Sequence, residues 1–158
     1  PNITHIKLAE LELKGKLKAV ITQNIDGLHQ KAGSKKVLEL HGSVLRNYCM
    51  KCNKFYNAEF IFNSNGIPKC ECGGIIKPDV VLYEEGLDDI VFNEAINAIQ
   101  KADLMIVAGT SLTVNPASSL VRCFNGSNLV LINRDSTQYD NIANLIINEN
   151  LGNVFKNI

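Results

Sequence analysis

The pattern of apolar and polar positions alternates along the chain between short apolar runs and segments with helical spacing. Such apolar runs predict strands at 17–22, 36–43, 77–85, 103–111 and 128–133. Helical periodicity predicts helices at 3–13, 87–102 and 115–124, and a short strand and a helix are expected near the C-terminus. Buried strands that alternate with helices are typical of parallel sheets with right-handed crossovers. The predicted fold class is therefore α/β, with a doubly wound, Rossmann-like parallel sheet.

Capping residues support the ends of these helices. Gly15 is a plausible C-cap of the first helix, because glycine tolerates the left-handed backbone found there. Asp88 and Asp89 suit the positive end of the helix dipole. Asn115 is expected to cap the helix at 115–124, with Pro116 at its first position.

Three polar segments follow predicted strands, namely TQNID, AGTS and INRD. In doubly wound sheets, ligands bind at the carboxyl ends of the strands, so these segments are candidate binding loops. Gln23, Asn24 and Asp26 could hold a ribose or a carboxamide. Taken alone, however, they are better read as a capped turn. The segment GTSL at 109–112 suits a phosphate or ribose, but it is neither a P-loop nor a GxGxxG motif.

Two further candidates remain ambiguous on residue type alone. Asn133 and Asp135 could bind a second ribose at the next strand end, or could serve as turn residues. His41 ends a predicted strand before Gly42, and histidine is the natural general base. A lone histidine is nevertheless more often structural.

Four of the five cysteines form two tight pairs between residues 49 and 72. The pairs are Cys49 with Cys52 and Cys70 with Cys72. Two turns that supply four thiolates are typical of a closed, structural zinc site, although unligated cysteines or a disulfide are the alternatives. The second pair is CxC rather than the usual CxxC, and Gly73 and Gly74 could relax that turn.

Composition and charge narrow the function classes. Sixteen basic and sixteen acidic residues cancel, which argues against a nucleic-acid binder. No apolar run approaches the roughly 18–20 residues of a membrane-spanning helix, and no signal peptide is visible. We therefore expect a cytoplasmic protein, where paired cysteines are more often metal ligands than disulfides.

The motifs, in this order, resemble the sirtuins of bacterial type, the NAD-dependent protein deacylases. The resemblance rests on ITQNIDGLHQKAGS, ELHGS, the two cysteine pairs, KPDVVLYEE, GTSLTVNPASSL and LINRD, and it runs over essentially the whole chain. It implies an enzyme that transfers an acyl group from lysine to ADP-ribose with release of nicotinamide. The implied co-substrate is NAD, the implied metal is one structural zinc, and the partners are acyl-lysine proteins or peptides.

The resemblance also assigns roles to individual residues. It makes His41 the general base and gives the zinc ligands as Cys49, Cys52, Cys70 and Cys72. The cofactor contacts it implies are Gln23, Asn24, Ile25, Asp26, Gly109, Thr110, Ser111, Asn133, Arg134, Asp135 and Leu151. The implied substrate contacts are Val81 and Tyr83.

The chain departs from the sirtuin pattern in three places. The second cysteine pair is CxC, Glu84 replaces the glycine of the family's FGE, and the N-terminal strand with its GAGxS loop is absent. We therefore expect a fragment that begins within a helix and is inactive, or nearly so, by itself. The alternative is a non-catalytic zinc module that binds a nucleotide or a partner. The expected domains are a partial NAD-binding domain at 1–42 and 78–158 and a zinc module at 43–77.

Overall fold

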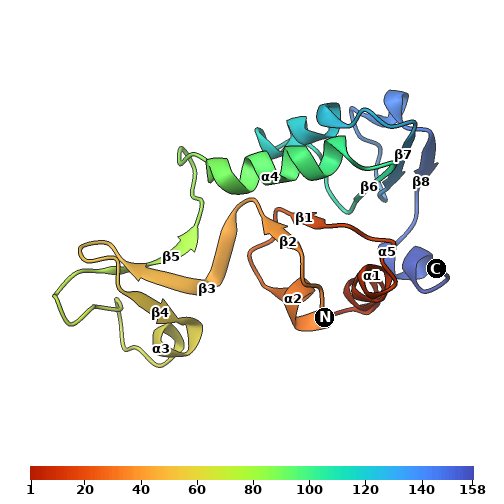
Figure 1. The fold of residues 1–158 in the computed structure, drawn as a ribbon. Coiled ribbons are helices and arrows are strands. Elements are labelled where there is room, and N and C mark those ends of the chain that lie inside the picture. The colour runs from red at the N-terminus through yellow and green to blue at the C-terminus, as the bar shows by residue number, and fades with distance from the viewer. The chain divides into compact units, whose positions relative to one another are not determined.

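The computed structural model describes the whole chain, Pro1–Ile158, as two compact units (Figure 1). The parallel unit comprises Pro1–Ile21, Leu28–Leu38 and Asp88–Ile158. The antiparallel unit comprises Thr22–Gly27 and Glu39–Leu87. Strands β1 (Val20–Thr22) and β2 (Val37–Glu39) pair in a two-stranded sheet.

The parallel unit is built on a three-stranded parallel sheet of order β6-β7-β8. Its strands are β6 (Leu104–Ala108), β7 (Asn128–Ile132) and β8 (Leu145–Ile147). The helices of this unit are α1 (Ile3–Leu13), α2 (Leu28–Ala32), α4 (Asp89–Gln100), the 3₁₀ helices η1 (Ala117–Cys123) and η2 (Asp140–Ile142), and α5 (Leu151–Phe155). The α/β class and the parallel sheet predicted from the sequence are thus confirmed.

A hydrophobic core cluster of the parallel unit packs on one face of this sheet. It is formed by Val107, Leu112, Val121, Leu129, Leu131 and Tyr139. The sequence predicted buried strands, but this is wrong for part of β6, where Leu104 and Ile106 are exposed. Because side chains of a strand alternate between faces, Leu104 and Ile106 lie on the face opposite Val107, where Ile132 of β7 is nonetheless buried.

The helix caps agree with the sequence in two cases and differ in one. Gly15 follows α1 with φ +70°, and the Asp88 carboxylate caps α4 by accepting hydrogen bonds from the Ile90 and Val91 amides. The helix expected at 115–124 is instead a 3₁₀ helix that begins at Ala117. The Asn115 side chain accepts a hydrogen bond from the Ser118 hydroxyl and makes no capping bond to a backbone amide.

The antiparallel unit is a three-stranded sheet of order β4-β3-β5 with one short helix. Its elements are β3 (Gly42–Cys49), β4 (Phe55–Asn57), α3 (Ala58–Phe62) and β5 (Ile76–Val80). The β3–β5 register shifts between Ser43 and Asn47, so the intervening residues bulge from the ladder. Its small core consists of Cys49, Tyr56, Cys70 and Ile76. None of the helices in either unit combines the length and apolar character needed to cross a membrane.

Candidate functional site

His41 lies in the turn between β2 and β3 and is half-buried. Its Nδ1 is 3.0 Å from the backbone carbonyl oxygen of Gln23. A carbonyl oxygen only accepts hydrogen bonds, so Nδ1 carries the proton and donates it to this contact. In the neutral ring Nε2 then bears the lone pair, which is the state a general base requires.

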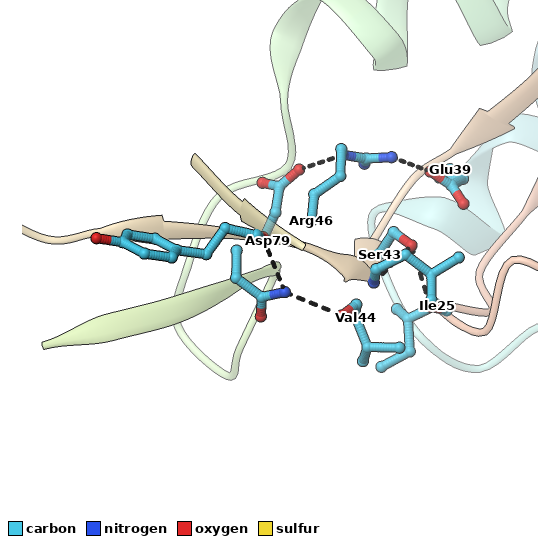
Figure 2. A network of polar contacts seen from close by, with 9 residues as sticks. Ile25, Glu39, Ser43, Val44, Arg46 and Asp79 are labelled. Carbon is cyan, nitrogen blue, oxygen red and sulfur yellow. Dashed lines mark hydrogen bonds and ion pairs between the residues drawn. The ribbon is translucent and has the colours of Figure 1, made fainter. Parts of the chain in front are cut away.

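The loop that supplies this carbonyl is held by hydrogen bonds to the end of β1 and to β3. The Asn24 amide donates to the Thr22 hydroxyl at 3.0 Å, and the Ile25 carbonyl accepts from the Val44 amide at 3.0 Å. The Ser43 hydroxyl also donates to the Ile25 carbonyl, as Figure 2 shows. The sequence-predicted residues Gln23, Asn24, Ile25 and Asp26 therefore lie together beside His41 in the antiparallel unit.

The backbone on the other side of His41 is fixed by β5. The His41 carbonyl accepts a hydrogen bond from the Val81 amide at 3.1 Å. Gly42 has φ +74°, and a Cβ at this position would overlap the carbonyl oxygen of Asp79. Only glycine fits such close strand contact at positive φ without displacing β5.

An ion-pair network ties the same region together from three strands (Figure 2). Arg46, on the bulge of β3, donates from Nη1 to Glu39 at 2.7 Å and from Nε to Asp79 at 2.8 Å. The Glu39 side chain is only 8% exposed, whereas that of Asp79 is 44% exposed. Sequence reasoning missed this network. The available signal was Glu39, a carboxylate in a predicted buried strand two residues before His41, because a buried charge needs a partner of opposite charge.

The turn that follows β5 carries the two predicted substrate contacts. Val81 is half-buried, and Tyr83 is fully exposed. Glu84, which replaces the family's glycine, has φ +69°, a left-handed backbone conformation that is uncommon for residues other than glycine. The Glu85 carboxylate closes the turn by accepting from the Leu82 amide at 2.9 Å and from Lys77 Nζ at 3.0 Å. The hydrogen bond from the Leu82 amide, and to a smaller extent that from Lys77, lowers the pKa of Glu85.

The predicted residues at the ends of β6 and β7 form a second group, in the parallel unit. The Gly109 amide donates to the Ile132 carbonyl at 3.0 Å, and Asn133 Nδ2 donates to the carbonyls of Thr110 and Asp135 at 3.1 Å. A Cβ on Gly109, whose φ is +63°, would lie 2.8 Å from Leu151 Cδ1. The structure thus brings Gly109, Thr110, Asn133, Asp135 and Leu151 together.

The two other predicted members of this group are Ser111 and Arg134. The Ser111 hydroxyl lies 2.8 Å from that of Thr113. Arg134 is exposed.

The four paired cysteines converge in the antiparallel unit. All four Sγ atoms lie within 4.8 Å of one another, with 3.5 Å between Cys49 and Cys72 and between Cys52 and Cys70. Tetrahedral zinc with Zn–S bonds of about 2.3 Å requires sulfur separations of about 3.8 Å, so this cluster fits the ion. The Tyr56 hydroxyl donates a hydrogen bond to Cys70 Sγ, and this bond is the main reason that the pKa of the Cys70 thiol is lowered to about 6.

The two glycines after Cys72 make the short CxC turn possible. Gly73 has φ +80°, as the sequence suggested for this turn. Gly74 serves a different purpose, because a Cβ there would lie 2.6 Å from Cys49 Sγ and 2.8 Å from Lys51 Cβ. Its missing side chain lets the two cysteine turns approach each other.

Comparison with known proteins decides the family. The Sir2 family matches residues 1–116. The chain belongs to the Sir2 family. This sirtuin chain is 64% identical over 156 residues to the NAD-dependent protein deacetylase of Clostridium perfringens, covering 98% of the chain and 64% of the relative. The protein of the same name from Clostridium acetobutylicum is 56% identical over 160 residues, covering 100% and 65%. The sirtuin chain therefore spans less than two thirds of the length of these relatives.

Solved sirtuin structures match the fold as well. A complex of Sir2 with a p53 peptide and NAD⁺ has 45% sequence identity and a TM-score of 0.92, covering 99% of this chain and 68% of that structure. Sir2 with the inhibitor EX-527, 2′-O-acetyl-ADP-ribose and a deacetylated p53 peptide has 44% identity and the same TM-score, covering 99% and 70%. The resemblance seen in the motifs is thus confirmed at the level of family and fold.

Proposed function

We propose that the protein containing this sirtuin chain is an NAD-dependent protein lysine deacylase. The reaction moves the acyl group of an acyl-lysine to ADP-ribose and releases nicotinamide. The observation that carries the proposal is the hydrogen bond from His41 Nδ1 to the Gln23 carbonyl, which leaves Nε2 as a base. The named relatives and the sirtuin complexes support the same activity.

His41 has one proton-transfer task in this scheme. The acyl oxygen of the substrate attacks the ribose carbon that carries nicotinamide, and nicotinamide leaves. Nε2 of His41 then takes the proton of a ribose hydroxyl, whose oxygen bonds to the acyl carbon. The bond between the acyl carbon and the lysine nitrogen then breaks, a water molecule adds at the acyl carbon, and the original acyl oxygen stays on the ribose carbon as its hydroxyl. The products are free lysine, nicotinamide and O-acyl-ADP-ribose.

The remaining site roles in this proposal are those that the resemblance implies. The loop beside His41 holds the nicotinamide and its ribose through Gln23, Asn24, Ile25 and Asp26. The strand-end group of the parallel unit contacts the rest of the cofactor through Gly109, Thr110, Ser111, Asn133, Arg134, Asp135 and Leu151. The acyl-lysine substrate lies against Val81 and Tyr83, beside the turn closed by Glu85.

Zinc has a structural role in this proposal. Cys49, Cys52, Cys70 and Cys72 hold one zinc ion, whose four protein ligands leave no open position for substrate. The zinc module spans 43–77, and 1–42 with 78–158 form the cofactor-binding part. Metal-ligating cysteine pairs suit the reducing cytoplasm, where we place the protein.

The test measures product formation directly. Two proteins are purified: the chain alone, and the chain fused to the part of the C. perfringens relative that lies outside the matched region. Each is incubated with NAD and an acetyl-lysine peptide. Mass spectrometry is expected to detect O-acetyl-ADP-ribose with the fusion and little or none with the chain alone. His41→Ala is expected to abolish the product. Absence of product from a folded, zinc-loaded fusion would contradict the proposal and favour a non-catalytic nucleotide- or partner-binding module.

A further inference from the structure

Tyr56 is the one residue other than the cysteines whose side chain hydrogen-bonds to a sulfur of the cysteine cluster. Its hydroxyl lies 3.1 Å from Cys70 Sγ. Both residues are nearly inaccessible to solvent, with Tyr56 8% and Cys70 5% exposed. A buried tyrosine hydroxyl needs a hydrogen-bond partner, and here that partner is a metal-ligand atom.

The position of this hydroxyl is fixed by its surroundings. Tyr56 lies on β4 directly opposite Asn47 of β3, and the buried Asn47 side chain donates to the Tyr56 carbonyl at 3.4 Å. The ring packs against Phe60 with 4.5 Å between ring centroids, and Lys54 Nζ lies 5.7 Å from the ring centroid. Backbone pairing and ring packing together therefore aim the O–H at Cys70.

Such a contact acts on the metal through its ligand. When Cys70 binds zinc as a thiolate, the tyrosine O–H donates a charge-assisted hydrogen bond to the sulfur. This bond orients the sulfur and offsets part of the excess negative charge of a four-thiolate site. Losing an outer partner of this kind typically lowers metal affinity about 10-fold to 100-fold.

We propose that Tyr56 is a positioning residue of the metal site, whose hydroxyl orients the Cys70 thiolate and slows the release of zinc. The inference rests on the zinc site alone and does not depend on the deacylase reaction. Neither NAD nor an acyl peptide is needed to test it.

The experiment compares Tyr56→Phe with Tyr48→Phe in the zinc-loaded chain. Tyr48 lies in the same sheet, and its ring packs against Phe55 at 5.7 Å, so the control also removes a tyrosine hydroxyl from this unit. Zinc transfer to a colorimetric chelator is followed over time at neutral pH. Tyr56→Phe is expected to release zinc about 10-fold faster than the wild type, and Tyr48→Phe at the wild-type rate.

A second readout separates an effect on the ligand from a loss of packing. In the cobalt-substituted chain, Tyr56→Phe is expected to shift the sulfur-to-cobalt charge-transfer band, whereas Tyr48→Phe leaves it in place. Zinc release at the wild-type rate would overturn the proposal. So would faster release with an unchanged charge-transfer band, because that result would show that Tyr56 acts only through stability.

Discussion

Substituting Gly42 by alanine tests how closely the His41 turn packs against β5. Gly42 and Gly66 both lie in the antiparallel unit and both have φ +74°. A Cβ on Gly66 would meet no atom within 4 Å, whereas a Cβ on Gly42 would overlap the Asp79 carbonyl. The two substitutions therefore share the backbone strain and differ only in the steric clash.

The expected magnitudes follow from this difference. An L-residue in the left-handed region costs roughly 1–2 kcal/mol, which both variants incur. Gly42→Ala must also displace the backbone of β5, because the Asp79 carbonyl carbon would be 2.9 Å and the Val80 Cα 3.4 Å from the new Cβ. Such overpacking adds about 1–3 kcal/mol. We expect the free energy of unfolding to fall by about 1–2 kcal/mol for Gly66→Ala and about 2–5 kcal/mol for Gly42→Ala.

Urea unfolding of both zinc-loaded variants, followed by circular dichroism, measures this difference. Amide hydrogen exchange adds a local readout, because the Val81 amide donates to the His41 carbonyl. Val81 is expected to exchange faster in Gly42→Ala and at the wild-type rate in Gly66→Ala. Equal losses of stability in the two variants, within about 0.5 kcal/mol, would refute the reasoning.

Three further predictions concern charge and metal. Arg46→Met removes the guanidinium that pairs with the nearly buried Glu39 carboxylate, and we expect the free energy of unfolding in urea to fall by about 2–3 kcal/mol. Asp79→Asn, at the more exposed ion pair, is expected to lower it by less than about 1 kcal/mol. A larger loss for Asp79→Asn than for Arg46→Met would contradict this account of the network. Glu85 has a lowered pKa, so its contribution to the stability of the turn is fully present above the unfolded-state pKa of about 4.3 and is lost as the pH falls through the folded-state pKa. NMR titration of the Leu82 amide should show a midpoint below about 4.3, and a midpoint at or above this value would argue against the contact. Removing the metal with a chelator is expected to abolish the protection of backbone amides from hydrogen exchange in β3 and β4, because the small core of the antiparallel unit includes two ligand cysteines. Protection in β6 and β7 is expected to remain. Protection that persists in β3 and β4 would show that the antiparallel unit folds without metal.

The elements of the fold were largely predictable because local rules act on them directly. Helix α4 begins where Asp88 offers its carboxylate to backbone amides, and α1 ends before a glycine at positive φ. The helix at 115–124 was harder to predict. The Asn115 side chain is engaged by the Ser118 hydroxyl, and a 3₁₀ helix forms, which residue preferences alone do not distinguish from an α-helix.

The candidate site was predictable in its residues but not in its contacts. Histidine at a strand end indicated a base, yet the tautomer of His41 depends on a backbone carbonyl 18 residues earlier. Backbone groups carry no residue-specific signal, so spacing could not reveal this partner. The partner of Arg46 was equally hidden from spacing, because its side chain reaches Asp79 across a bulge that only the β3–β5 register shows.

The CxC pair illustrates how a departure from a family pattern is compensated within the backbone. The second cysteine turn has one residue fewer between its cysteines than the usual CxxC pair. Gly73 supplies the left-handed conformation that redirects the chain, and Gly74 removes the Cβ that would collide with Cys49 Sγ and Lys51. All four sulfur atoms consequently remain within 4.8 Å of one another, so the shorter spacing is accommodated without loss of a ligand.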